Sequence, residues 1–307
     1  MKKILLKVLP KLKISICLAL CLAVCIAAPC LAFAKTDKRA AADANKVVLK
    51  IWQIDSFEGG KGSRADFLQS IGDDFAKSGG SYVSVVSLSA DAARFNLGAG
   101  NLPDLISYGA GMYGIESYIK DYVSWCHGGY CILSLDTATD FSDVNSKNTV
   151  INEGKDNFVG AAALLNGIAD AEYVKCTTAY VSLINGKYKY LLGTQRDIFR
   201  LKTRGVSFAV KPLTEFNDLY QNISVTANGD RAALAKRFCN YLLSRTSEVN
   251  RVGMFNNIGG LYDDELRAME GVSYDYKLIS PVSENVREKL EQAVSVGDIN
   301  MLKNLLK

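Results

Sequence analysis

Residues 47–60 have the sequence VVLKIWQIDSFEGG, a run of β-branched and apolar residues that ends in a loop with two carboxylates and two glycines. Such a run predicts a β-strand. Ser63 is a candidate cap for a helix whose apolar residues recur at helical spacing. A strand at 82–88, a helix at 90–97 and a short strand at 105–107 continue the alternation. Strands that alternate with helices imply crossover connections, so the sequence predicts an α/β fold with a parallel-rich sheet.

The second half of the chain gives a more mixed pattern. Local rules favour a β-hairpin around Asn185-Gly186, because this pair is a strong signal for a two-residue turn between strands. A helix is expected near 158–168, and an amphipathic helix is expected at 231–243. The C-terminal 40 residues are also expected to be helical, with a final apolar stripe from Met301 to Leu306.

The N-terminus has the layout of a secretory signal. Lysines occupy positions between Lys2 and Lys13, and the 21 residues from Ile14 to Ala34 carry no charge and end in Ala-Phe-Ala. We therefore expect residues 1–34 to be a signal peptide and the protein to be extracellular or held at the cell surface. An uncleaved segment that anchors the chain in a membrane is the alternative. A lipoprotein anchor fits poorly, because no cysteine in this region follows a small residue.

Removal of the signal changes the charge balance of the chain. The five lost charges are all lysines, so the formal charge falls from +4 to near −1. A basic surface for nucleic acid therefore loses its support, and no nucleic-acid partner is expected. The remaining length of about 273 residues is long for a single core and suits two lobes.

Four cysteines remain after the signal, and two of them lie close together in the sequence. Cys126 and Cys131 flank His-Gly-Gly-Tyr, so a local disulfide across a glycine-rich turn is the favoured interpretation for an exported chain. Free buried thiols are the alternative. His127 is the one histidine of the chain, and this argues against a zinc site with four ligands. We expect no metal and no cofactor.

Two loops that follow predicted strands carry candidate ligand-binding residues. In open α/β sheets, ligands bind beyond the carboxyl ends of the strands. The first loop offers Trp52, Asp55 and Glu58, and the second follows the strand that ends at Tyr108. An aromatic ring at such a place could stack on the apolar face of a sugar. The alternative is that Trp52 and Tyr108 are core residues and that the two acids face solvent.

A third segment places polar side chains after an apolar run. Gly193 and Thr194 are followed by Gln195, Arg196 and Asp197. Amide and guanidinium groups of this kind can bond the hydroxyls of a neutral polyol. The alternative is that Arg196 and Asp197 form a structural ion pair that caps the next helix.

These segments, with WCHGGY at 125–130, resemble the extracellular solute-binding proteins of ABC importers, in the group that includes sugar binders. The stretches INGKYKYLLGTQRDIFRL at 184–201 and LAKRFCNYLLSRTSEVNRVGMFNNIGGLY at 234–262 are also similar to that family. The resemblance implies a two-lobe, periplasmic-binding-protein-like fold of type II with a ligand cleft between the lobes. It also implies a helix at 177–184 and a strand at 189–192 in place of the hairpin.

The resemblance divides the chain into lobes and places residues in the cleft. The first lobe comprises 35–124 and 214–258, and the second, which is short, comprises 125–213 and 259–307. The resemblance puts these residues in or near the cleft: Trp52, Asp55, Tyr108, Trp125, Gln195 and Arg196.

The expected function is that of a monomeric binding protein. It captures a small solute, a sugar or oligosaccharide, by lobe closure and delivers it to an ABC permease. A surface receptor that senses the ligand without transport is one alternative. A secreted hydrolase that acts on glycans is a weaker one, because Asp55 and Glu58 lie on a single loop and no catalytic motif accompanies them. We therefore expect no enzymatic activity.

Overall fold

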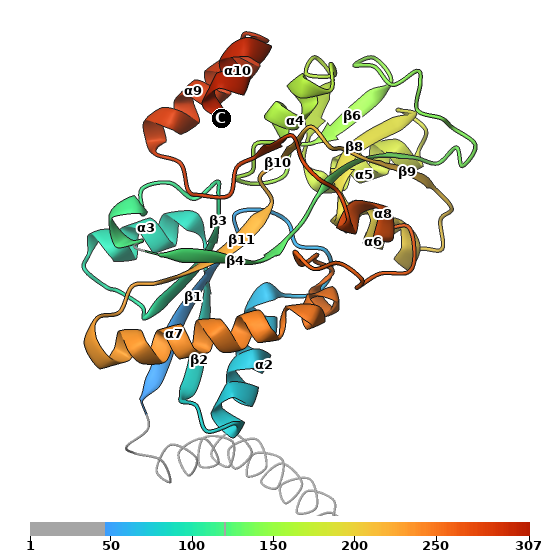
Figure 1. Ribbon diagram of the computed structural model, residues 1–307. Coiled ribbons are helices and arrows are strands. Elements are labelled where there is room, and N and C mark those ends of the chain that lie inside the picture. Colours follow the sequence, from blue (N-terminus) through green and yellow to red (C-terminus); the bar gives the residue numbers. More distant parts are fainter. Residues whose placement is uncertain (1–46, 120) are drawn as a thin grey trace, which may run out of the picture. The chain divides into compact units, whose positions relative to one another are not determined.

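A computed structural model of the chain describes residues 47–119 and 121–307, of which 48–307 form one structural unit (Figure 1). The expected signal peptide at 1–34 lies outside the described residues. Within the described part of the chain, no helix has the length and apolarity that crossing a membrane requires.

The first sheet has five strands in the order β2-β1-β3-β11-β4 (Figure 1). Strand β1 pairs in parallel with β2 and β3, whereas β11 runs antiparallel to β3 and β4. The bounds are β1 Val48–Ile54, β2 Tyr82–Leu88, β3 Leu105–Gly109, β4 Tyr122–His127 and β11 Tyr220–Val225. The predicted strands at the start of the chain are confirmed, and a later strand, β11, returns to complete this sheet.

Helices cover both faces of the first sheet. Helix α2 (Arg64–Lys77) packs on β2 and on α7 (Gly229–Ser244), whereas α3 (Ala90–Gly98) contacts β1 from a separate apolar cluster. Successive side chains of a strand point to opposite faces, so neighbouring residues of one strand feed both clusters. The backbone N–H of Asp66 donates to Ser63 Oγ at 3.1 Å, and the predicted cap of α2 is thereby confirmed.

The second sheet also has five strands, in the order β7-β6-β8-β5-β9. Strand β6 runs parallel to β7 and β8, and β5 runs antiparallel to β8 and β9. The strands are β5 Tyr130–Ser134, β6 Thr149–Asn152, β7 Glu172–Val174, β8 Tyr190–Thr194 and β9 Ala209–Pro212. The helices of this part are α4 Val159–Leu165, α5 Cys176–Ile184 and α6 Gln195–Thr203.

The hairpin that local rules favour around Asn185-Gly186 is wrong. The segment before this turn is helix α5, and β8 pairs with β5 and β6 rather than with its own predecessor. Burial decides between the two, because α5 places Ala179, Tyr180 and Leu183 in the second core. The helix and strand implied by the family resemblance are confirmed.

Shorter elements and the C-terminal helices complete the fold. They are the 3-10 helices η1 Glu116–Tyr118 and η2 Thr246–Val252, helix α8 Arg267–Glu270, the paired strands β10 Phe216–Asn217 and β12 Tyr276–Lys277, and helices α9 Glu284–Ser295 and α10 Ile299–Leu305. Helix α9 packs on α4, and this contact joins the C-terminal helices to the part of the chain that contains the second sheet (Figure 1). We name the first sheet with α2, α3 and α7 the first lobe, and the second sheet with its helices the second lobe.

Where the chain passes between the lobes, a small set of backbone hydrogen bonds holds the crossing segments together. His127 and Phe255 exchange two backbone hydrogen bonds of 2.9 and 2.8 Å, and Gly128 N donates to Leu219 O at 2.7 Å. Strand β4 stays in the first sheet as far as His127, three residues beyond the expected boundary at 124. The ends of the lobes at 124, 213 and 258 stay predictions.

The predicted disulfide between Cys126 and Cys131 is not formed. Both thiols are free and buried, because β4 carries Cys126 into the first sheet and β5 carries Cys131 into the second. Burial raises the pKa of both thiols. The two glycines between these cysteines therefore serve a crossing between sheets rather than a turn closed by sulfur.

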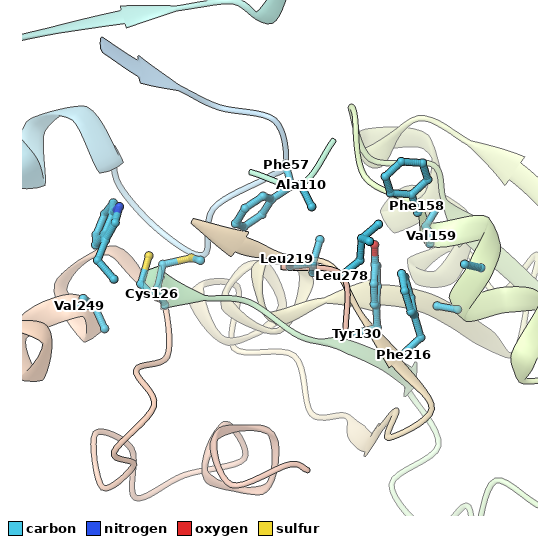
Figure 2. Close-up of a cluster of buried hydrophobic side chains, with 14 of the residues drawn as sticks. Phe57, Ala110, Cys126, Tyr130, Phe158, Val159, Phe216, Leu219, Val249 and Leu278 are labelled. Carbon is cyan, nitrogen blue, oxygen red and sulfur yellow. The ribbon is translucent and has the colours of Figure 1, made fainter. Parts of the chain in front are cut away.

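A buried carboxylate supports the crossing where the chain enters the second lobe. Asp218 accepts hydrogen bonds from Tyr130 Oη at 2.7 Å and from Phe158 N at 2.7 Å. Its partners Tyr130 and Phe158 belong to an apolar cluster, and Figure 2 shows them together with Phe216, Leu219 and Leu278. Burial raises the pKa of Asp218 from 3.8 to about 6, in spite of these two donors.

This elevated pKa predicts a pH dependence of stability. The folded protein holds the proton of Asp218 more tightly than the unfolded chain, so the free energy of unfolding should fall as the pH rises from about 4 to about 6. A difference of this size corresponds to about 3 kcal/mol. Asp218→Asn should remove that dependence, as measured by urea unfolding at a series of pH values. An exposed substitution, Asp230→Asn, is the control for general charge effects. Parallel curves for wild type and Asp218→Asn between pH 4 and 7 would contradict the assignment.

Candidate functional site

A polar pocket lies where the loop after β1 meets the second lobe. Its volume is about 230 Å³. It is lined by Asp55, Phe57, Glu58, Gly59, Gly62, Ser63, Arg64, Lys155 and Arg196. The structure thus brings together Asp55, Glu58 and Arg196, three of the residues that the sequence predicted for the cleft.

Asp55 is held in place by an arginine of the first lobe. Arg64 begins α2, and its Nε donates to Asp55 Oδ1 at 2.9 Å, while its second terminal nitrogen bonds the carbonyl of Phe57. The guanidinium also lies over the Phe57 ring, 4.2 Å from its centre. Gln53 donates to the same oxygen of Asp55 at 3.0 Å. The carboxylate therefore enters the pocket in a fixed orientation and with its charge balanced.

Glu58 connects the two lobes. It lies on the first-lobe loop, and its Oε2 is 3.4 Å from Asn152 Nδ2 and 3.8 Å from Arg196 Nε. Asn152 ends β6 and Arg196 is in the first turn of α6, so both partners belong to the second lobe. The contact to Arg196 is too long for a hydrogen bond, and Arg196 Nε has no hydrogen-bond partner among the described residues.

Gln195 and Asp197 hold the framework of the site and do not line the pocket. Gln195 is fully buried and accepts a hydrogen bond from Gly129 N at 3.0 Å. Asp197 completes a capping box with Thr194 at the start of α6 and accepts from Asn152 Nδ2 at 3.1 Å. Burial raises the pKa of Asp197. The structural alternative is thus correct for Asp197, although its ion-pair partner is Arg200, at 3.0 Å, rather than Arg196.

The three aromatic residues predicted for the cleft lie elsewhere. Tyr108 is fully buried in the cluster beneath α3, and Trp52 packs against the same cluster from β1. Trp125 is 1 % exposed, stacks on Phe67 with ring centres 5.6 Å apart, and donates to Ser107 Oγ at 3.1 Å. Tyr108 and Trp125 lie on strands that are covered by packed side chains, so these two rings fill the cores. The prediction that the Tyr108 ring stacks on a sugar is therefore wrong, and Trp125 lies in the core and not in the cleft.

The site also contains residues that the sequence reasoning missed. Arg64 directly follows the cap of α2, and Lys155 lies in the polar loop NEGKDN that leaves β6 at 152–157. The second of these had a usable signal, because the loop follows the carboxyl end of a parallel strand, where ligands bind in α/β sheets. The position of Arg64 gave no such signal, since its role depends on a contact with Asp55.

The buried hydroxyl of Tyr108 provides a test of its role. This Oη has no hydrogen-bond partner among the described residues, and burial raises its pKa. Tyr108→Phe should therefore leave ligand affinity unchanged and keep or raise the free energy of unfolding, by up to about 1 kcal/mol. Tyr130→Phe is the contrasting variant, because its hydroxyl bonds Asp218 and Asn157, and it should destabilise by about 1–3 kcal/mol. Calorimetry measures the affinity, and urea unfolding measures the free energy of unfolding. A loss of affinity in Tyr108→Phe would show that Tyr108 contacts the ligand.

Comparison with known proteins identifies the fold. No protein-family model matches the sequence, and no curated protein has a sequence significantly similar to it. Iron-bound HitA from Pseudomonas aeruginosa is similar in structure, with a TM-score of 0.52 and 12% identity over 84% of this chain and 99% of that one. The cyclic alpha-maltosyl-1,6-maltose binding protein from Arthrobacter globiformis has a TM-score of 0.53 and 11% identity over 85% and 96%.

A third similar structure is a two-component system protein described as mediating signal transduction. Its TM-score is 0.52, with 13% identity over 80% of this chain and 99% of that chain. At such low identities these similarities concern the fold alone. The chain has the two-lobe, periplasmic-binding-protein-like fold of type II, with one five-stranded sheet in each lobe.

Proposed function

We propose that this protein is the extracellular solute-binding component of an ABC importer. It captures a small solute between its lobes and delivers it to a membrane permease. The observation that carries the proposal is the pocket of about 230 Å³, whose walls come from both lobes and include five charged side chains. The fold supports the proposal, because two of the similar structures are those of an iron-bound protein and a maltosyl-maltose binding protein.

The mechanism follows from the position of Glu58. A ligand that bonds the loop of Asp55 and Glu58 in the first lobe and Arg196 or Lys155 in the second gains contacts only when the lobes are together. Such a ligand shifts the population toward the closed form. Binding at micromolar concentration requires about −8 kcal/mol. Several charge-assisted hydrogen bonds inside a pocket of this kind are sufficient for that.

The ligand class that we propose is a carbohydrate or a related polyol. Carboxylate and guanidinium groups bond hydroxyls in pairs, and Asp55, Glu58 and Arg196 offer both kinds of partner. Because Tyr108 and Trp125 are in the cores, recognition would rest on these polar contacts and not on stacking against either of these rings. We propose no catalytic role, since Asp55 is already paired with Arg64.

A ligand-sensing receptor without transport is the second candidate function. One of the structures with this fold is a two-component system protein. The two functions differ in the partner of the closed form, which is a permease in one and a signalling protein in the other. Crosslinking of the ligand-bound protein on its own cells, followed by identification of the partner, separates them.

Arg196→Ala tests the cleft. Loss of this second-lobe contact should weaken ligand binding by about 10- to 100-fold, the equivalent of a charge-assisted hydrogen bond. The matched control is Arg237→Ala on the exposed side of α7, which should bind as wild type does. Isothermal titration measures the affinity, and small-angle scattering measures closure with ligand. Equal affinities of the two variants would place the ligand elsewhere.

Gly111→Ala tests whether the approach of the lobes matters for binding. A Cβ at Gly111 would lie 1.6 Å from the carbonyl oxygen of Asp156 in the second lobe, so this loop could not keep its contact. We expect weaker affinity by at least about tenfold, with faster dissociation. Gly98→Ala is the control, because a Cβ there meets no atom within 4 Å. Stopped-flow binding compares the two, and wild-type dissociation in Gly111→Ala would show that closure does not need this contact.

A further inference from the structure

A second pocket adjoins the candidate site along α6. Its volume is about 320 Å³. It is lined by Gly60, Lys61, Gly62, Arg196, Phe199, Arg200, Thr203 and Arg204. Gly62 and Arg196 line both pockets, so the two form neighbouring parts of one cleft between the loop after β1 and the second lobe.

The second pocket is lined by four cationic side chains and by no carboxylate. Arg200 is paired with Asp197 beneath it. Lys61 lies over the ring of Phe199, 5.3 Å from its centre, and Arg204 lies 4.8 Å from the ring centre of Tyr180. Neither Lys61 nor Arg204 has a carboxylate within 4 Å in the described part of the chain. Among the described residues, their positive charges are therefore not neutralised by a contacting carboxylate.

This concentration of cations contrasts with the net charge of residues 47–307 as a whole. Residues 47–307 contain 27 lysines and arginines and 30 aspartates and glutamates. The linings of the two pockets nevertheless contain six cationic residues and only Asp55 and Glu58 as acids. A cleft lined by one sign of charge concentrates the field and attracts ligands of the opposite sign.

The arginines of the cleft also have N–H groups without acceptors. Arg196 Nε has no hydrogen-bond partner among the described residues, and the same is true of one terminal nitrogen of Arg64. Lys155, in the first pocket, has no carboxylate within 4 Å in that same part of the structure. A buried N–H donor without an acceptor lowers the stability of the folded protein. An oxygen-rich ligand near Arg196 would accept a hydrogen bond from this group and remove that cost.

The two pockets therefore suit different chemical groups, which could be the two ends of one molecule. Asp55 and Glu58 accept hydrogen bonds, which suits the hydroxyls of a polyol. Arg196, Lys61 and Arg204 donate them and carry charge, which suits a phosphate or a carboxylate. We infer that the solute is an anionic polyol, either a sugar phosphate or a sugar acid, with its anionic group in the pocket of Lys61 and Arg204. This inference rests on the proposed function and specifies the substrate class of the same cleft.

The test is a titration of the full protein with matched neutral and anionic probes. The panel pairs common hexoses and pentoses with their phosphates and with the corresponding aldonic and uronic acids, and it includes inorganic phosphate. We expect at least one anionic sugar to bind at least tenfold tighter than its neutral parent. Its affinity should fall severalfold in 0.5 M salt, because the Debye length shortens. Phosphates and acids are separate arms, so the preferred anionic group is read directly.

Variants locate the anionic group. Lys61→Gln and Arg204→Gln should each weaken the anionic ligand by about fivefold or more and leave a neutral sugar unaffected. Both side chains are exposed, so the fold should tolerate the changes, and melting temperature verifies this. Lys236→Gln on α7 is the control for a lost exposed cation, and it should leave both affinities unchanged.

The remaining outcomes overturn the inference in distinguishable ways. Neutral sugars that bind as well as their anionic partners, with lobe closure, would overturn the anionic assignment and leave the proposed solute capture standing. Inorganic phosphate that binds as tightly as any sugar phosphate would remove the polyol half of the assignment. If no anionic sugar binds, the inference is wrong. If in addition no solute of any class closes the lobes, the proposed function fails with it.

Discussion

The two lobes depend on a crossing at Gly128, where a side chain would displace the buried amide of Gln195. A Cβ there would lie 2.7 Å from Gln195 Nε2, and Gly128 N is bonded to Leu219 O at 2.7 Å. Gln195 begins α6, so the residue that closes around this glycine is the neighbour of Arg196. The place at which the chain changes sheets therefore also fixes the helix that provides the second-lobe wall of the cleft. A shift of this crossing would move the wall with it.

Within the cleft, buried groups orient the exposed ones. Asp197 is buried and bonds Asn152, and Asn152 in turn reaches Glu58 across the lobes. On the other side, Arg64 holds Asp55. The pocket thus has carboxylates fixed from behind by buried partners, with cations that are less constrained around them. Such preorganisation lowers the entropic cost of binding at the two carboxylates, because the ligand does not need to order their side chains.

Much of the fold could be predicted from the sequence. Period-two strands such as 82–88 and the capped helix after Ser63 carry local signals, and these are confirmed. The segment around Asn185 needed the family resemblance, since its local turn signal favoured a hairpin that tertiary pairing of β8 excludes. The prediction that aromatic residues line the cleft failed for a physical reason. A ring at the end of a strand looks the same in sequence whether the loop beyond it is open or, as at Tyr108, covered by α3.

The site was predictable only where chemistry and chain position coincide. A general rule about α/β sheets pointed to Asp55 and Glu58, and the polar run after Gly193 pointed to Arg196, and these three residues do line one pocket. The charge of the cleft was not predictable, because it arises from Lys61 of one lobe and Arg204 of the other, 143 positions apart in the sequence. The net charge of residues 47–307 is negative, so it would have predicted a preference for cationic ligands. A ligand responds to the residues that line its pocket, and in these two pockets the lining has more cationic than acidic residues.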